Sequence, residues 1–150
     1  MGYLPIFVAL SGLVLLYSLY TYNQIKPKKA ALTLVIDQMA KISSERKNII
    51  LTYDRANDNS VLNEAAADLM KTSTDRFQSF RKENELITKT NEGASNLSDV
   101  EKDLKNQILA LNQKQEKQLE QLQSRANQYN RFISKAPTKF IASIFGFKSF

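Results

Sequence analysis

The N-terminal stretch is the feature that most constrains this chain, because residues 1–25 contain no charged side chain. Residues 4–22 are largely apolar. As a helix rising about 1.5 Å per residue, they would be about as long as the hydrocarbon core of a bilayer is thick. A buried core helix rarely runs this far without a charge. A cleaved signal peptide needs a basic segment before the apolar run and small residues after it, whereas bulky tyrosines follow here. We therefore predict a retained transmembrane helix.

The residues around this helix predict its orientation. The lipid-facing positions of the predicted anchor, residues 1–25, are Leu4, Phe7, Leu10, Leu13, Leu16 and Tyr20. A basic flank follows immediately at Lys26, Lys28 and Lys29. Since basic residues stay on the cytoplasmic side, we expect a single pass in a bacterial inner membrane, with the N-terminus outside and the bulk of the chain in the cytoplasm.

The composition limits the chemistry available to the chain. It has no Cys and no His, which removes disulfides, thiol nucleophiles, the usual general base and the commonest metal ligands. Asp99, Glu101 and Asp103 lie close together, but at a helix start they favour the helix dipole. We predict no enzyme, no cofactor and no metal site. The few Gly and Pro residues favour long helices over β structure.

The net charge of +6 is concentrated at the two ends of the chain. Lys26, Lys28 and Lys29 follow the anchor, and no acidic residue occurs from Gln121 onward, while the middle is nearly neutral. Nucleic acid would suit the sign of this charge, but a tethered chain meets anionic lipid first. The predicted partners are a lipid membrane, further copies of the chain in a homo-oligomer and an unknown protein, with no nucleic acid.

Residues 26–135 are predicted to form a bundle of three long antiparallel helices. Apolar residues recur at spacings of three and four over 28–56, 61–90 and 98–135, which indicates amphipathic helices. Pro27 can kink the chain or start a new helix. Weak helix formers at 57–60 and 91–96 predict turns, with Gly93 available as a left-handed helix stop. Ser98 and Glu101 fit a capping box.

The apolar seams of these helices contain a few polar positions. Arg46 is the polar exception in the first stripe, and Gln115 and Gln118 interrupt the third. Glutamine is a good helix former on a wet face. Alternatively, its amide could form hydrogen bonds between subunits.

The tail, residues 136–150, combines basic and aromatic residues. Pro137 can open a short helix that places Phe140, Ile141, Ile144 and Phe145 on one face, and Gly146 then ends it. The residues expected to make the tail contact are Lys139, Phe140, Ile144, Phe145, Phe147 and Phe150. This segment can lie in a membrane interface or dock on the bundle.

The chain also resembles a known family at both ends. Tyr22-Asn23 follows the span, and the C-terminal part carries Tyr129-Asn130, Ile133, Pro137, Ala142 and Phe145-Gly146-Phe147. These residues resemble the landmarks of the bacterial LemA family, of which the chain would be a divergent or shortened member. The resemblance implies a single-pass membrane protein with a cytoplasmic helical bundle and no established enzymatic activity. A related branch acts in magnetosome membrane formation, which suggests a membrane-organising role.

Two layouts are open for the tail. In the preferred one, an up-down-up bundle carries the tail away from the membrane. In the other, residues 57–60 are only a distortion, one long helix leaves the membrane and the third helix brings the tail back. In either layout, we predict a non-catalytic membrane-anchored scaffold that self-assembles through its bundle and organises or tethers membrane. The alternative is a stalk or adaptor subunit that holds a separate complex at the membrane.

Overall fold

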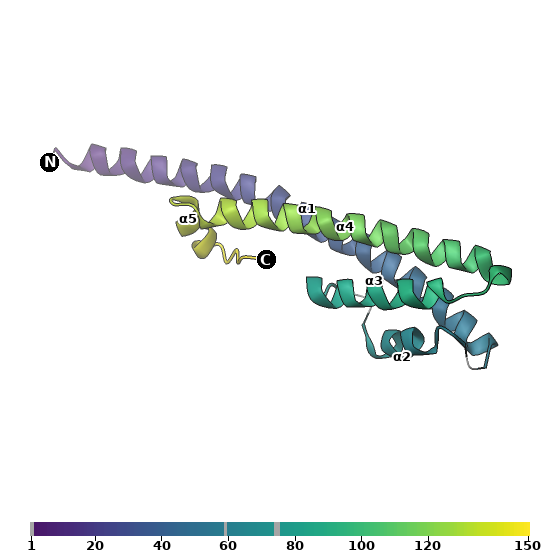
Figure 1. Cartoon of the computed structure of the whole chain (residues 1–150). Helices are drawn as coiled ribbons and strands as arrows, with labels where there is room; N and C mark the ends of the chain where they lie inside the picture. Colours follow the sequence, from purple (N-terminus) through teal and green to yellow (C-terminus); the bar gives the residue numbers. More distant parts are fainter. Residues whose placement is uncertain (1, 59, 74–75) are drawn as a thin grey trace. The chain divides into compact units, whose positions relative to one another are not determined.

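The computed structural model describes residues 2–58, 60–73 and 76–150, and these residues form helices joined by turns, without strands. The all-α class is therefore confirmed for this part of the chain (Figure 1). The chain divides into two compact units. The first joins the residues up to Thr33 with Gln123–Phe150, and the second is Leu34–Leu122. Two helices, α1 (Leu4–Ala56) and α4 (Lys102–Ser134), contribute residues to both units.

The first helix, α1, continues through Pro27, where the sequence predicted a kink or a new helix start. A proline inside a helix removes one backbone hydrogen bond and costs about 3 kcal/mol. Burial on both sides of the proline offsets this cost, since Ile25 and Leu32 are buried in the first unit. The anchor segment and the first amphipathic segment are therefore one helix.

The second predicted helix is wrong as a single element, because residues 61–90 contain a break. The structure has α2 (Asn63–Lys71) and α3 (Phe80–Ser95) in its place. The Thr72 hydroxyl donates to the carbonyl of Asp68 at 2.8 Å, so the side chain competes with the backbone where α2 ends. Ser79 begins α3 as its N-cap and accepts a hydrogen bond from the backbone of Lys82 at 3.3 Å. Phe77 and Phe80 belong to the apolar stripe predicted over 61–90, and they are half-buried.

The predicted turns have mixed outcomes. The turn after α1 is confirmed at Asn57 and Asp58, and Asn59 lies outside the described residues. The turn over 91–96 is predicted too early, since α3 continues to Ser95. Gly93 is helical there and is not a left-handed stop. It lies against Leu62, whose Cδ2 would be 2.7 Å from a Cβ built on the glycine. The position therefore requires a small residue because α3 packs closely on the start of α2.

Replacing Gly93 with valine is expected to destabilise the second unit by about 1–3 kcal/mol, because the added methyl groups overpack the fully buried Leu62. The matched control is Glu92→Val on the exposed face of the same helix, which should change stability by less than about 0.5 kcal/mol. Thermal unfolding of the two variants in detergent measures the difference. Equal melting temperatures would show that Leu62 does not need the space.

The core of the second unit is apolar near the turn that follows α1. Ile50, Leu62, Ala66, Leu69, Leu86, Ala94, Leu97 and Ile108 form one buried cluster. The Tyr53 hydroxyl beside this cluster donates to the Glu101 carboxylate. Glu101 also accepts from the backbone amide of Ser98 at 3.2 Å, which confirms the predicted capping box. Hydrogen bonds lower the pKa of Glu101, the larger effect coming from Tyr53 and the smaller from Ser98. This carboxylate therefore stabilises the fold above its ordinary pKa and less at acidic pH.

The inward stripe of the last long helix is largely confirmed. A short 3-10 turn, η1 (Asp99–Glu101), leads into α4. The apolar stripe predicted over 98–135 faces inward: Leu104 is half-buried, and the buried residues are Ile108, Leu111, Leu119, Leu122, Ala126, Tyr129 and Ile133. After α4, the peptide bond before Pro137 is cis, and α5 (Thr138–Ile144) follows. Gly146 then ends this short helix with a φ of 70°, as predicted.

Candidate functional site

The predicted anchor residues all lie on the exposed surface of α1. Leu4, Phe7, Leu10, Leu13, Leu16 and Tyr20 are between 57% and 77% exposed. Only 6% of the most apolar window of this helix is buried in the described chain. Burial within the chain therefore does not explain why this stretch is apolar. By length and composition, α1 is a candidate membrane span, a test that an N-terminal signal sequence also passes.

The tail lies against α1 directly after this apolar stretch. The ring of Tyr22 is 5.0 Å from that of Phe145 and 5.8 Å from that of Phe147, measured between ring centroids. These contacts contradict the preferred layout, in which the tail ends far from the anchor. The physical reason lies in the helices: the predicted second long helix is two short ones, and α4 itself continues into the first unit and brings the tail to Tyr22.

Two of the three predicted flank lysines contact aromatic rings at this site. The Lys29 ammonium lies 5.5 Å from the centroid of the Phe147 ring, and that of Lys28 lies 5.3 Å from the Phe132 ring. Such cation–π contacts are worth about 0.5–1 kcal/mol each at exposed sites. Lys26 is exposed. The predicted flank and tail therefore come together in the structure through Lys29 and Phe147, while Lys28 contacts α4.

The predicted apolar face of α5 is only partly correct. The residues that α5 buries are Thr138, Ile141 and Ala142. Phe140 and Ile144, predicted to share the contact face with Ile141, are each 73% exposed. The buried residues of α5 are instead those that face the rest of the unit, because a helix of two turns presents only one narrow stripe to its neighbour. Phe140 and Ile144 are thus an exposed apolar pair on the tail.

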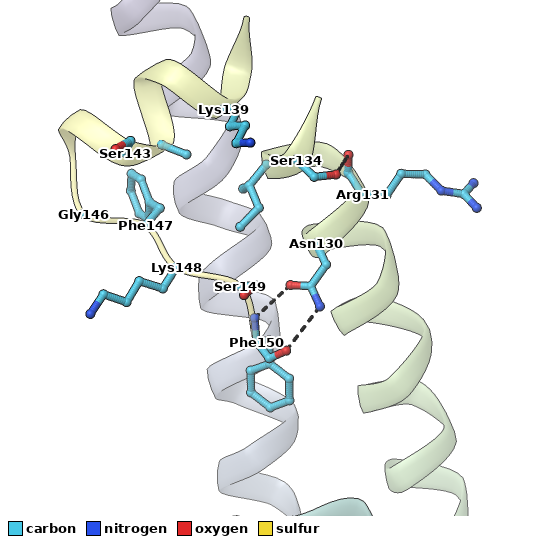
Figure 2. A pocket seen from close by; sticks show the side chains of 12 residues that line it. Asn130, Arg131, Ser134, Lys139, Ser143, Gly146, Phe147, Lys148, Ser149 and Phe150 are labelled. Carbon is cyan, nitrogen blue, oxygen red and sulfur yellow. Dashed lines mark hydrogen bonds between the residues drawn. The ribbon is translucent and has the colours of Figure 1, made fainter. Parts of the chain in front are cut away.

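Hydrogen bonds from α4 hold the end of the tail. The Tyr129 hydroxyl donates to the carbonyl of Lys148 at 3.1 Å, and burial raises the pKa of this tyrosine. Asn130 exchanges two hydrogen bonds with the backbone of Phe150: its Oδ1 accepts from the amide at 2.8 Å, and its Nδ2 donates to the carbonyl at 3.2 Å (Figure 2). Residues 147–150 therefore lie along α4 in a defined position. This role for Tyr129-Asn130 was not predicted, although the pair had been singled out in the sequence.

An open hollow of about 660 Å³ lies between α4, α5 and residues 147–150 (Figure 2). Its lining includes the cations Arg131, Lys139 and Lys148, the hydroxyls of Ser134, Ser143 and Ser149, and an apolar part at Ile133, Ala142, Phe147 and Phe150. No acidic side chain is among the lining residues of the described chain. Of the predicted tail contacts, Lys139, Phe147 and Phe150 line this hollow.

The second unit contains a buried polar layer whose contacts were not predicted. Arg46 is fully buried, and its Nη1 donates to Asn112 Oδ1 at 2.9 Å. Asn112 donates in turn to Thr90 Oγ1 at 2.9 Å and to Asn91 Oδ1 at 2.7 Å. Gln115 is also fully buried and donates to Ser43 at 3.0 Å and to Glu83 at 3.1 Å. Gln115 thus uses its amide nitrogen for hydrogen bonds within the chain.

Arg46 is only partly satisfied in this layer. Burial lowers the pKa of Arg46, and the charge of the nearby Glu83 carboxylate opposes that shift. The Nε and Nη2 atoms of Arg46 have no hydrogen-bond partner among the described residues. The signal for this layer was visible in the sequence, since Arg46 and Gln115 both interrupt apolar stripes. Nothing in the sequence spacing identified Glu83, Thr90 and Asn112 as their partners.

The described residues hold no group of three or more Asp and Glu side chains placed to bind a metal ion. Comparisons of the chain with protein families, with curated proteins and with solved structures find no match. Membership of the LemA family therefore stays a prediction based on the residues quoted above.

Proposed function

We propose that this chain is a non-catalytic structural protein that is anchored in a membrane by residues 4–22 and self-associates there. The observation that carries the proposal is the contact of Phe145 and Phe147 with Tyr22. Aromatic rings and lysines collect where a transmembrane helix leaves the hydrocarbon, since their apolar parts and polar ends suit the interface. Rings from both ends of the chain and the lysine Lys29 meet at that point, beside the exposed apolar part of α1.

The basic flank supports the orientation that we propose. Lys26, Lys28 and Lys29 follow the apolar stretch, so the N-terminus lies outside and the remainder lies in the cytoplasm of a bacterial cell, at the inner membrane. An antiparallel bundle is part of the same proposal. Its support is the order of the contacts in the second unit: Tyr53 bonds Glu101, Arg46 bonds Asn112 and Ser43 bonds Gln115. Partners later in the chain, from Glu101 to Gln115, bond residues that come earlier along α1, from Tyr53 back to Ser43. This is the order expected of two antiparallel helices.

Self-association needs a surface that the chain leaves uncovered. The stripes of the bundle are used within the chain, as the burial of Val35, Ile108 and Leu122 indicates. The longest run of exposed apolar residues lies within residues 4–20, and Phe140 and Ile144 add an exposed pair on the tail. We therefore place the contact between copies at the membrane, where a shared plane concentrates the chains for lateral association.

Cysteine crosslinking in native membranes tests this function, because the chain has no cysteine of its own. Ile144→Cys is expected to give covalent dimers with a short thiol crosslinker. Glu116→Cys, an exposed position of α4 in the second unit, is the matched control and should remain monomeric. Light scattering of the full chain in mild detergent should give more than one copy per particle. A single-chain particle, with no crosslink at position 144, would contradict self-association.

The alternative function is a stalk or adaptor subunit, and one observation favours it. The continuity of α1 from Leu4 to Ala56 provides an unbroken helical connection between the apolar segment and the second unit, which suits a protein that holds another complex. In the same membranes, this function predicts a different protein in constant ratio with the chain, and crosslinks from Glu116→Cys to that protein instead of dimers from Ile144→Cys.

A further inference from the structure

The hollow beside the tail has the composition of an anion site. Three cations, Arg131, Lys139 and Lys148, line it, and the lining residues of the described chain include no acidic side chain. A carboxylate at Phe150 would add one negative charge, and the charges around the hollow would still sum to a positive value. Hydroxyl groups of Ser143 and Ser149 add neutral donors, while that of Ser134 donates to the carbonyl of Arg131 at 3.1 Å. Since every charged lining side chain is a donor without acceptor capacity, the ligand must supply the acceptors.

We propose that this hollow binds a phosphate group. Phosphate oxygens are strong acceptors, and hydrogen bonds from Arg and Lys to them are about twice as strong as neutral ones. A volume of about 660 Å³ is large enough for a phosphate and the group esterified to it. The apolar part of the lining, at Ile133, Ala142 and Phe147, suits a phosphate ester better than a bare inorganic ion.

The wall of the hollow is held in place before any ligand binds. Asn130 fixes the backbone of Phe150 with two hydrogen bonds, and Tyr129 fixes the carbonyl of Lys148. The side chains of Arg131 and Lys148 point to opposite sides in Figure 2, so their charged ends do not converge on one point. Binding therefore requires their head groups to turn inward, which costs side-chain entropy and makes the affinity moderate.

The position of the hollow indicates where the phosphate comes from. Phe147 belongs to its lining and also contacts Tyr22 and Lys29, directly after the apolar stretch of α1. If residues 4–22 span a membrane, these contacts place the hollow at the level of the lipid head groups. The lipid source rests on the proposed membrane anchor, whereas the phosphate chemistry does not. A phospholipid head group and a free phosphate are thus two sources of one ligand, and the experiment separates them.

The test uses the full chain in phosphatidylcholine nanodiscs. Titration with inorganic phosphate and with glycerol phosphate is followed by phosphorus NMR line broadening. In a second arm, native mass spectrometry counts the lipids retained from mixtures of phosphatidic acid and phosphatidylcholine. The test variant is Arg131→Gln/Lys139→Gln/Lys148→Gln. The control, Lys102→Gln/Lys114→Gln/Lys117→Gln, removes the same charge from exposed positions of α4.

We expect the test variant to bind each phosphate ligand at least about tenfold more weakly than the wild type, and the control to bind as the wild type does. Binding of phosphatidic acid supports a lipid source, and binding of the soluble phosphates alone supports a soluble one. If both variants lost affinity equally, net charge alone would explain the effect and the proposed site would be wrong. The site would also be wrong if the wild type bound no phosphate ligand in either arm. If the chain does not enter nanodiscs, the soluble titration in detergent still decides on the site, while the proposed anchor fails.

Discussion

Replacing Leu10 and Leu13 together with arginine is expected to release the protein from membranes. Both side chains are exposed on the apolar part of α1, at 57% and 64%. An arginine near the centre of a transmembrane helix costs about 2.5–3.5 kcal/mol on insertion scales, and two of them remove most of the preference of the segment for lipid. The fraction of protein that resists alkaline carbonate extraction measures the effect. It should fall from nearly complete to a minor share.

The control for this experiment is Leu34→Arg/Met70→Arg, since these side chains are exposed to a similar extent, at 57% and 55%, but lie in the second unit. They should leave the membrane fraction unchanged because water already surrounds them in the proposed arrangement. The two pairs have the same chemistry and similar exposure, so a difference between them can only come from lipid. Carbonate resistance of the Leu10/Leu13 variant, or extraction of the wild type, would contradict the anchor.

Replacing Arg46 with methionine is expected to destabilise the second unit by about 3–5 kcal/mol. Methionine is apolar and unbranched like the stem of arginine, but it is shorter and carries no charge. The substitution therefore leaves the Glu83 carboxylate, which is only 8% exposed, without the cation near it. It also removes the hydrogen bond from Arg46 to Asn112. Thermal unfolding in detergent, followed by circular dichroism, should give a melting temperature lower by about 10–20 °C.

The double variant Arg46→Met/Glu83→Met should recover most of this loss. Removing both charges also removes the cost of burying them. Two nitrogen atoms of Arg46 have no hydrogen bond in the described structure, so its interactions do not fully offset the free energy of desolvating it. Lys41→Met, at an exposed position of α1, is the surface control and should change stability by less than about 0.5 kcal/mol. A double variant as unstable as the single one would show that Arg46 matters through packing and not through its charge.

Local patterns predicted the helices where one rule dominated. The uncharged stretch, the capping box at Ser98 and the helix stop at Gly146 each depend on residues next to one another, so the sequence was sufficient. The break between α2 and α3 was not predicted because the apolar spacing continued across it, whereas the hydrogen-bonding side chain of Thr72 ends the helix. At Gly93, packing on Leu62 was mistaken for a backbone requirement.

The candidate site was only half predictable, because its parts come from the two ends of the chain. The sequence indicated the lysines and the aromatic tail as separate features, but no local rule relates Tyr22 to Phe147. The orientation of α5 was wrong for the same reason: periodicity locates an apolar face, while the neighbour that covers it decides which residues are buried. The buried layer around Arg46 likewise depends on contacts between distant helices.

The contact of the tail with Tyr22 also has a consequence for biosynthesis. Phe145 and Phe147 are translated more than 120 residues after Tyr22, so the apolar segment leaves the ribosome long before the rings that cover its end exist. During that interval Ile25, which is fully buried in the finished protein, lacks the C-terminal part of the unit that buries it. In a prematurely terminated polypeptide the side chain of Ile25 would stay uncovered. A quality-control protease that recognises exposed apolar side chains would thereby distinguish incomplete products from complete ones.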